Sequence, residues 1–291
     1  MTKLEKKAIL VIVLMTLVWG GTFPLVKVLL NFLSPVNLLM YRFLFAALIA
    51  FPFLLRDIKK NRKYILKLII LSILLYIAYY AQTVGLKYTT SSKSAFITGL
   101  YVIFTPIFAL FFTKEKLTLK LSISLLLSLM GLALLSNLTF MHFEINIGDL
   151  ITIISAVTFA IQIVLTNIYA KEIDILFITS FQMVFMFAMG IPFAGNFLKV
   201  AMPLWVLLSL IFLGCFAGFL AVLAETYSLK YLDPDRAAIL FTLEPVFAGI
   251  FSFIFLNERL SLNGITGAFL ILVAMWLAST SKVKKVLSSK E

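Results

Sequence analysis

The segment from residue 8 to residue 30, AILVIVLMTLVWGGTFPLVKVLL, decides the fold class of this chain. Its one charged side chain is Lys27. As a helix the segment would be roughly 34 Å long, enough to cross the hydrocarbon core of a bilayer. It is too long for the apolar region of a signal peptide and has no A-x-A cleavage site. We therefore expect it to be the first transmembrane helix.

Further apolar segments of similar length fill most of the chain. Hydrophobic residues make up 62% of the sequence and charged residues 13%, whereas soluble domains carry roughly 25% charged residues. The segments are 35–55, 68–86, 94–112, 121–138, 150–170, 175–193, 203–224, 237–256 and 264–280. They show no strand alternation, and lipid accepts only helices or closed barrels. The sequence predicts an all-α membrane protein with ten transmembrane helices and no room for a soluble catalytic domain.

The basic residues between these segments predict the orientation. The net charge is +12, which in a soluble protein would suggest nucleic acid. With the N-terminus placed in the cytoplasm, 19 of the 25 basic residues lie in cytoplasmic segments and 4 in external ones. This bias places both termini in the cytoplasm and favours an even number of spans. We expect membrane lipid, and no nucleic acid, as a partner.

An internal repeat relates the two halves of the chain. Residues 81–119 aligned on residues 224–262 are identical at fourteen of 39 positions, where shared Leu and Phe would give about four by chance. Earlier in the chain the offset is 140 residues, and Pro52-Phe53 aligns with Pro192-Phe193. We expect two five-helix repeats, 1–142 and 143–291. Since five is odd, the second repeat is inverted, which is typical of transporters with a midplane site; the alternative is a duplicated membrane protein without transport.

Three ionisable residues lie well inside the spans. A charge at the bilayer centre costs about 2.5–3.5 kcal/mol on insertion scales, so each suggests a function. Lys27 is near one end of its helix and can instead reach the headgroups. Arg42 and Glu244 have opposite charges and similar depth. They form either an ion pair between the second and ninth helices or a substrate or proton site.

Other unusual residues at mid-depth complete the predicted site. Trp19 lies near mid-span beside two glycines, although Trp usually prefers the interface. The amides of Gln162 and Gln182 need partners in lipid, either another helix or a polar cavity. We predict that one central cavity binds substrate through Trp19, Arg42, Thr98, Tyr101, Gln162, Gln182 and Glu244.

Helix breakers and a pair of polar repeat mates suggest moving parts. Interrupted helices at corresponding places in two halves indicate a transporter binding site, although Gly and Pro are also common packing residues in membrane helices. The predicted breaks are at Gly20, Gly21, Pro24, Pro106 and Pro245. Gln82 and its repeat mate Glu225 are predicted at opposite ends of the third and eighth spans. There they act as opposed gates or, alternatively, as helix caps.

The sequence offers no catalytic set. It has one cysteine and one histidine, Cys215 and His142, which excludes an internal disulfide and multi-cysteine or histidine-rich metal sites. It contains no Walker A loop, HExxH or GxSxG motif. We therefore expect no enzyme activity, no metal and no cofactor.

With these residues in place, the chain resembles the EamA-like branch of the drug/metabolite transporter superfamily over nearly its whole length. The resemblance rests on Trp19-Gly20 with Lys27, Arg42-Phe43, Ser94-Ala95-Phe96-Ile97-Thr98 with Pro106, Glu115-Lys116-Leu117, Leu243-Glu244-Pro245-Val246-Phe247-Ala248 and Asn257-Glu258-Arg259-Leu260. It implies a ten-helix fold with a central cavity and alternating access. Members move amino acids, other metabolites or drugs, often outward.

We accordingly expect a permease of the plasma (inner) membrane, a monomer or homodimer, that exports an amino acid or related small metabolite. Arg42 favours a substrate with a carboxylate. Glu244 suits a cation, so the alternative within transport is a drug or quaternary-cation exporter. An intramembrane enzyme is the alternative from another class, and the missing nucleophile and metal ligands count against it.

Overall fold

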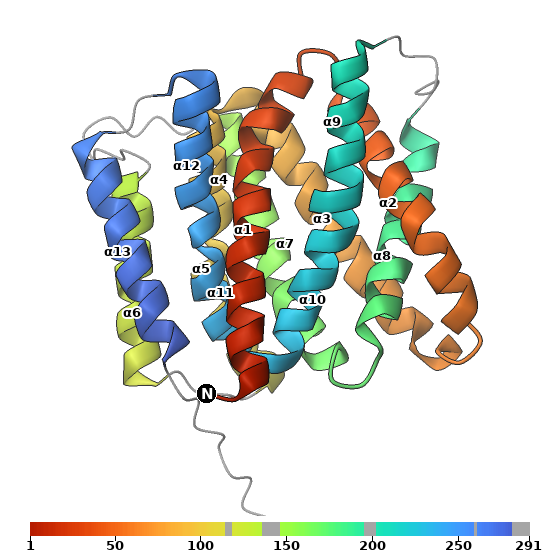
Figure 1. Cartoon of the computed structure of the whole chain (residues 1–291), viewed down its shortest axis with the longest axis horizontal. Helices are drawn as coiled ribbons and strands as arrows, with labels where there is room; N and C mark the ends of the chain where they lie inside the picture. Colours follow the sequence, from red (N-terminus) through yellow and green to blue (C-terminus); the bar gives the residue numbers. More distant parts are fainter. Residues whose placement is uncertain (114–117, 136–145, 195–201, 259–260, 281–291) are drawn as a thin grey trace, which may run out of the picture.

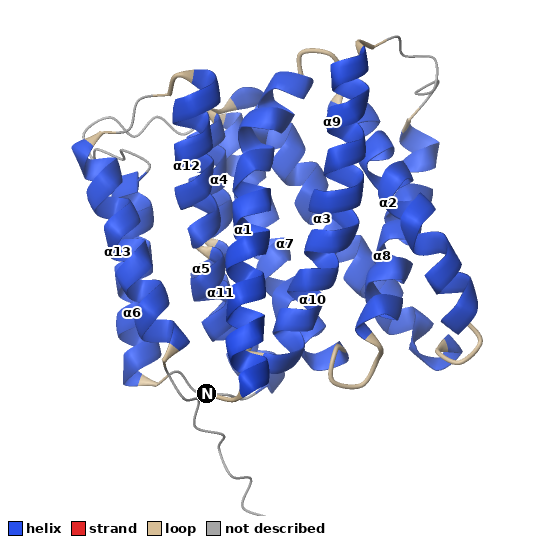
Figure 2. Ribbon diagram, in the orientation of Figure 1, coloured by secondary structure: helices blue, strands red, loops and turns tan. Residues whose placement is uncertain are grey.

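The structure is a computed structural model that describes residues 1–113, 118–135, 146–194, 202–258 and 261–280. Every regular element in these ranges is a helix, in agreement with the predicted class (Figure 2). Nine helical segments are long and apolar enough to cross a membrane within the described ranges: Lys3–Leu29, Pro35–Asp57, Arg62–Tyr88, Ser91–Thr113, Ile147–Tyr169, Ile175–Phe193, Leu204–Tyr231, Pro234–Leu256 and Leu262–Ser279.

A tenth apolar helix is shorter. It is α6, Leu119–Leu135, with 17 residues. The sequence predicts that this span continues to residue 138, but residues 136–138 lie outside the described ranges. The described part of the chain thus has nine to ten apolar helices of the kind that cross membranes.

Several spans are built from more than one element. The helices are α1 Lys3–Leu29, α2 Pro35–Asp57, α3 Ile65–Tyr88, α4 Ser91–Gly99, α5 Tyr101–Thr113, α6, α7 Ile147–Tyr169, α8 Ile175–Gly190, α9 Leu204–Gly214, α10 Ala221–Tyr231, α11 Pro234–Phe241, α12 Leu243–Leu256 and α13 Leu262–Ser279. A π-helix, η4 Cys215–Leu220, joins α9 to α10. Short 3-10 turns, η1 Arg62–Tyr64 and η2 Ile191–Phe193, adjoin α3 and α8.

The spans run alternately up and down through one bundle (Figure 1). We call the end at which α1 begins the lower end, and the end at which α1 and α3 finish the upper end. At the two sides of the bundle, α2 packs on α8 and α6 packs on α13. Between them, α3 packs on α7 and α1 packs on α10 and α12. Consequently α1, α3, α7, α10 and α12 surround the centre of the molecule.

The fourth and ninth spans are interrupted, as the sequence predicts, but not at the prolines themselves. The fourth span breaks at Leu100, between α4 and α5, six residues before Pro106. The ninth breaks at Thr242, between α11 and α12. Because Pro245 lacks an amide hydrogen and its ring collides with the carbonyl four residues earlier, the helix is weakened there. The breaks lie close together, since the rings of Tyr101 and Phe241 are 6.4 Å apart.

The predicted break in the first span is wrong. α1 continues unbroken from Lys3 to Leu29 through Gly20, Gly21 and Pro24. The reason for Gly20 is contact with α12: a Cβ there would lie 2.5 Å from Cβ of Phe247 and 2.9 Å from the carbonyl oxygen of Glu244. Gly20 thus allows two backbones to approach closely, rather than bending one.

This contact predicts that Gly20→Ala destabilises the fold by about 1–3 kcal/mol, the usual cost of forcing atoms into a packed core. Gly21→Ala is the matched control, because its Cβ would lie 3.5 Å from the ring of Phe251, an ordinary contact. Alanine there should gain helix propensity, by up to about 1 kcal/mol. Thermal unfolding of both variants in detergent measures this. Equal melting temperatures for the two variants would contradict the close contact.

The eighth span is longer than the sequence predicts and has an additional irregularity. It runs from Leu204 to Tyr231, not to residue 224. Glu225 therefore lies inside the membrane-spanning helix rather than at its end, which corrects its predicted position. The π-helix at Cys215–Leu220 was not predicted. Such wide turns loosen the regular backbone hydrogen bonding and are frequent at functional sites.

Candidate functional site

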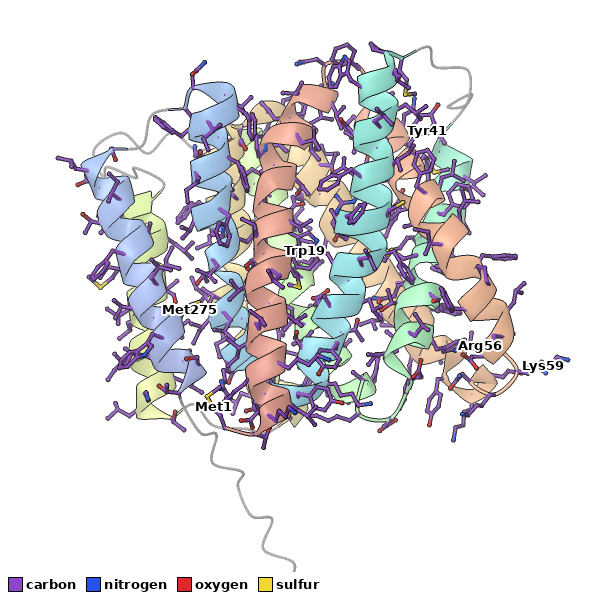
Figure 3. All side chains as sticks on the ribbon, in the orientation of Figure 1. Met1, Trp19, Tyr41, Arg56, Lys59 and Met275 are labelled. Atoms are coloured by element: carbon purple, nitrogen blue, oxygen red, sulfur yellow. The ribbon has the colours of Figure 1, made fainter. Side chains whose placement is uncertain are left out.

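The π-helix η4 supplies a carbonyl that holds two of the predicted site residues. Nε1 of Trp19 donates to the carbonyl oxygen of Ala217 at 2.9 Å, and Nη2 of Arg42 donates to the same oxygen at 3.2 Å. Figure 3 shows Trp19 about half-way up the bundle. A carbonyl oxygen has two lone pairs and can accept both bonds. α1 and α2 are thereby connected to the eighth span at mid-depth.

Arg42 is enclosed but only partly bonded. Its side chain is 2% exposed, and its guanidinium carbon lies 4.4 Å from the ring centre of Tyr79. A cation over an aromatic face is stabilised by the ring's quadrupole, more so when desolvated. Nε of Arg42 has no hydrogen-bond partner in the described part of the structure. The guanidinium therefore keeps a free donor.

Arg42 and Glu244 do not form an ion pair. The ion pairs of the described residues are Arg56–Asp57, Lys67–Glu172 and Lys93–Asp149. Arg42 and Glu244 nevertheless line the same cavity and are close enough for their charges to interact. The simple structural alternative, a direct bridge between the second and ninth spans, is therefore not what the structure contains.

One central cavity brings together most of the predicted site. Its walls come from α1, α2, α3, α4, α5, α7, α10, α11 and α12. The lining residues are Trp19, Thr22, Arg42, Tyr79, Gln82, Thr98, Tyr101, Phe159, Ile163, Glu225, Phe241 and Glu244. Five of the seven predicted binding residues are among them, together with both predicted gates, Gln82 and Glu225.

The cavity is narrow in this conformation. The volume open to the centre of a water molecule is about 20 Å³, close to the minimum needed for a single water. Three of the lining residues have buried polar atoms without partners in the described residues, namely Nε of Arg42, the hydroxyl of Tyr101 and Oε2 of Glu225. Since buried polar atoms almost always find a partner, water or a polar ligand is the natural one here.

Gln162 and Gln182 do not line the cavity. Gln162 donates from Nε2 to Oγ1 of Thr166 at 3.0 Å and lies beside Glu225. Gln182, in α8, is fully buried, and neither atom of its amide has a partner in the described structure. Depth in a span is visible in a sequence, but the direction in which a side chain points from its helix is not. This explains why both were grouped with the cavity.

Tyr79 is the most important cavity residue that was not predicted from the sequence. It lies near one end of the predicted third span, 68–86, where Tyr is common as an interfacial residue. A signal was present, because Tyr79 precedes Gln82 by three residues and so shares its helix face. Gln82 itself donates from Nε2 to Oγ1 of Thr98 at 3.4 Å. α3 and α4 thus meet at the cavity through polar side chains.

The lining follows the internal repeat of the sequence. With an offset of 140 in the first span and 143 further on, eight of the twelve lining residues fall into four pairs. The pairs are Trp19 and Phe159, Gln82 and Glu225, Thr98 and Phe241, and Tyr101 and Glu244. Each half thus contributes equivalent positions, but the charges differ between the mates.

These features define a multi-pass helical membrane protein with a polar site enclosed at its centre. The chain belongs to the EamA-like transporter family, whose family profile matches residues 6–137 and again 146–280. Transport of small molecules across a membrane is therefore its class of function. Of the signature residues, Glu115-Lys116-Leu117 and Arg259-Leu260 lie outside the described ranges, as does His142.

Individual relatives support the same family. An uncharacterized transporter of Archaeoglobus fulgidus is 32% identical over 268 residues, covering 91% of this chain and 83% of the relative. The uncharacterized transporter YoaV of Bacillus subtilis is 24% identical and covers 93% and 96%. A solved crystal structure with 16% identity matches 94% of this chain and 96% of its own, with a TM-score of 0.77. That last likeness shows the fold alone.

Proposed function

We propose that the chain exports an amino acid or a related small amphiphilic metabolite by alternating access around the central cavity. One observation carries this proposal: a buried guanidinium, Arg42, and two buried carboxylates, Glu225 and Glu244, line one enclosed space. A zwitterion matches such a lining, because its carboxylate can bind Arg42 and its amine a carboxylate. Buried charges are tolerated only when they are paired. A substrate with both charges therefore provides a partner for the guanidinium and for a carboxylate.

The packing of the helices supports two inverted repeats, 1–142 and 143–291. Exchanging the five spans of one half for those of the other leaves the packing scheme unchanged. The contact of α3 with α7 corresponds to the contact of the eighth span with α1. The contact of α1 with α12 corresponds to the contact of α7 with α4 and α5. The α2–α8 and α6–α13 pairs map onto themselves. A fold with this property offers two similar ways to reach one site.

A panel of radiolabelled amino acids tests the substrate class. The protein is reconstituted into liposomes, and counterflow of each compound is measured against empty liposomes. We expect saturable counterflow of at least one apolar or aromatic amino acid. If no amino acid is exchanged, while the reconstituted protein retains its melting transition, the zwitterion proposal is wrong.

The two carboxylates and the aromatic lining favour a second candidate, a drug or quaternary-cation exporter. Trp19, Tyr79 and Tyr101 offer ring faces of the kind that bind alkylated ammonium groups. Ethidium efflux distinguishes the two functions. A cation exporter moves ethidium, and amino acids do not compete with it. The transport activity of an amino-acid exporter is unaffected by ethidium.

For topology, we propose the inner membrane of the cell with both termini in the cytoplasm. A fusion of green fluorescent protein after residue 291 should fluoresce. This reporter becomes fluorescent in the cytoplasm but stays dark when it is carried across the membrane in unfolded form. The paired fusion after Phe193, at the other end of the bundle, should stay dark. The reverse pattern would overturn the orientation drawn from the basic residues. The basic residues of the C-terminal tail lie outside the described ranges.

A further inference from the structure

The C-terminal end of α3, at the upper end of the bundle, is held by Lys27. Nζ of Lys27 donates to the carbonyl oxygens of Leu86 at 2.8 Å, Thr89 at 2.6 Å and Lys87 at 3.4 Å. The last carbonyls of a helix have no partner within the helix. They also carry its negative dipole end, which attracts cations. Lys27 thus connects α1 to α3 directly above the cavity.

The C-terminal end of α10, at the lower end, is held in the same way by an amide. Nδ2 of Asn167, in α7, donates to the carbonyl oxygens of Leu229 at 2.7 Å and Leu232 at 2.9 Å. Lys171 in turn donates from Nζ to Oδ1 of Asn167 at 2.9 Å. Asn167 is 1% exposed. It connects α7 to α10 directly below the cavity.

The two contacts occupy equivalent positions in the repeat. An offset of 143 carries Leu86 to Leu229 and Thr89 to Leu232, and an offset of 140 carries Lys27 to Asn167. The same carbonyl pair is therefore bound at both ends, by a cation above and by an amide below. The repeat is defined by sequence identities, and Lys27 and Asn167 are not identical, so the agreement of their contacts is an additional likeness between the halves.

Each contact lies one helical turn from the cavity. Leu86 follows Gln82 by four residues in α3, and Leu229 follows Glu225 by four residues in α10. Gln82 and Glu225 line the cavity. Separation of α1 from α3 would uncover the cavity from above, and separation of α7 from α10 would uncover it from below.

Both ends are closed at once in this conformation. Above, Lys93 pairs with Asp149 at 2.6 Å, and Ser92 donates to Glu258. Below, Arg236, the repeat mate of Lys93, donates to the carbonyl oxygen of Ser279. With the narrow cavity between them, these contacts describe an occluded state.

We propose that Lys27 and Asn167 are repeat-related latches, and that the charge of Lys27 makes the upper latch the tighter of the two. The inference rests on the proposed alternating access but not on the identity of the substrate. Charge-assisted hydrogen bonds are roughly twice as strong as neutral ones. The lower end is therefore expected to open more readily than the upper end.

Distances between spin labels at each end test the latches without substrate. In full-length Cys215→Ser protein in lipid nanodiscs, one label pair replaces the exposed residues Asn31 and Tyr88 at the upper end. A second pair replaces Glu172 and Lys230 at the lower end. Pulsed electron resonance gives the distance distribution of each pair.

Lys27→Met should raise the population with a long upper distance roughly tenfold, the usual consequence of losing hydrogen bonds to a charged group. The lower distances should not lengthen. Asn167→Leu should do the opposite, by roughly three- to tenfold. Lys27→Arg should restore the short upper distance, because it keeps a cation with several donors.

Lys87→Met is the matched control. Lys87 neighbours the latch in sequence, and it bonds Lys27 through its backbone carbonyl oxygen, which methionine keeps. It should leave both distributions unchanged. If Lys27→Met lengthens neither distance, or lengthens both equally while the melting temperature falls, Lys27 is a structural contact and not a latch. Because no substrate is added, failure of the amino-acid proposal would leave this result unaffected.

Discussion

Glu244→Gln is expected to reduce transport by roughly 10- to 100-fold while the protein stays folded in the membrane. Hydrogen bonds to charged groups contribute about 1.5–3 kcal/mol, and each 1.4 kcal/mol changes a rate or affinity about tenfold. Glu244 lines the cavity, is 7% exposed and has no ion-pair partner among the described residues. Its replacement therefore strands no cation, and glutamine has nearly the same shape.

The measurement has two parts, initial rates of counterflow in liposomes and thermal unfolding in detergent. Glu172→Gln is the control, because it removes an exposed carboxylate whose partner is the exposed Lys67. Surface pairs contribute about 0–1 kcal/mol, so neither rate nor melting temperature should change appreciably. Normal counterflow in Glu244→Gln would show that this carboxylate does not contact the transported molecule.

Much of the fold could be predicted from the sequence because the bilayer limits the choices. A segment such as residues 8–30 has only one stable form in lipid. The ends of helices were less predictable: the eighth span continues seven residues past its predicted end and contains Glu225. Polar residues such as Ser228 lower the apolar character there, yet their hydroxyls are satisfied within the protein, for example by the carbonyl oxygen of Ala8.

The cavity could be predicted only in part, for a physical reason. A charge such as Arg42 or Glu244 must avoid lipid, so its position inside the bundle follows from its presence alone. An uncharged residue has more options. Gln182 is buried outside the cavity, whereas Tyr79, at a depth where interfacial tyrosines are common, lies under a guanidinium.

The irregular backbone of the eighth span had no clear sequence signal. Glycines at 214 and 218 flank or lie within η4, but glycine is frequent in membrane helices for packing alone. Gly214 indeed packs closely, since a Cβ there would lie 2.6 Å from the carbonyl oxygen of Arg42. The consequence that matters for the site, a carbonyl at Ala217 that binds Trp19 and Arg42, depends on three helices together.

Arg42→Met is expected to reduce transport of substrates with a carboxylate, again by roughly 10- to 100-fold, with a small loss of stability. The side chain of methionine has similar length, and the carbonyl oxygen of Ala217 keeps its bond from Trp19. No buried acceptor is left without a donor, which is the usual cause of a large loss. The surface variant Arg56→Met is the control, since Arg56 is exposed and bonded to its neighbour Asp57.

The substrates that survive Arg42→Met separate the two proposed functions. If the protein exports zwitterions, Arg42→Met loses amino-acid transport and gains no ethidium efflux. If it exports cations, removal of a positive charge from the cavity leaves ethidium efflux intact or increases it, while Glu244→Gln still abolishes it. Unchanged amino-acid counterflow in Arg42→Met would contradict the zwitterion proposal outright, whatever the result with ethidium.

The double variant Arg42→Met/Glu244→Gln then tests whether the two charges act through the substrate or through each other. Because the structure contains no bridge between them, their effects on melting should couple by less than about 0.5 kcal/mol, below the range for residues in direct contact. Their effects on transport should not add, because a zwitterion that has lost its contact with one charge is held only weakly, and loss of the second contact has a smaller further effect. Strong coupling in stability without coupling in transport would mean that Arg42 and Glu244 pair in the membrane, and that the cavity selects its substrate by other residues.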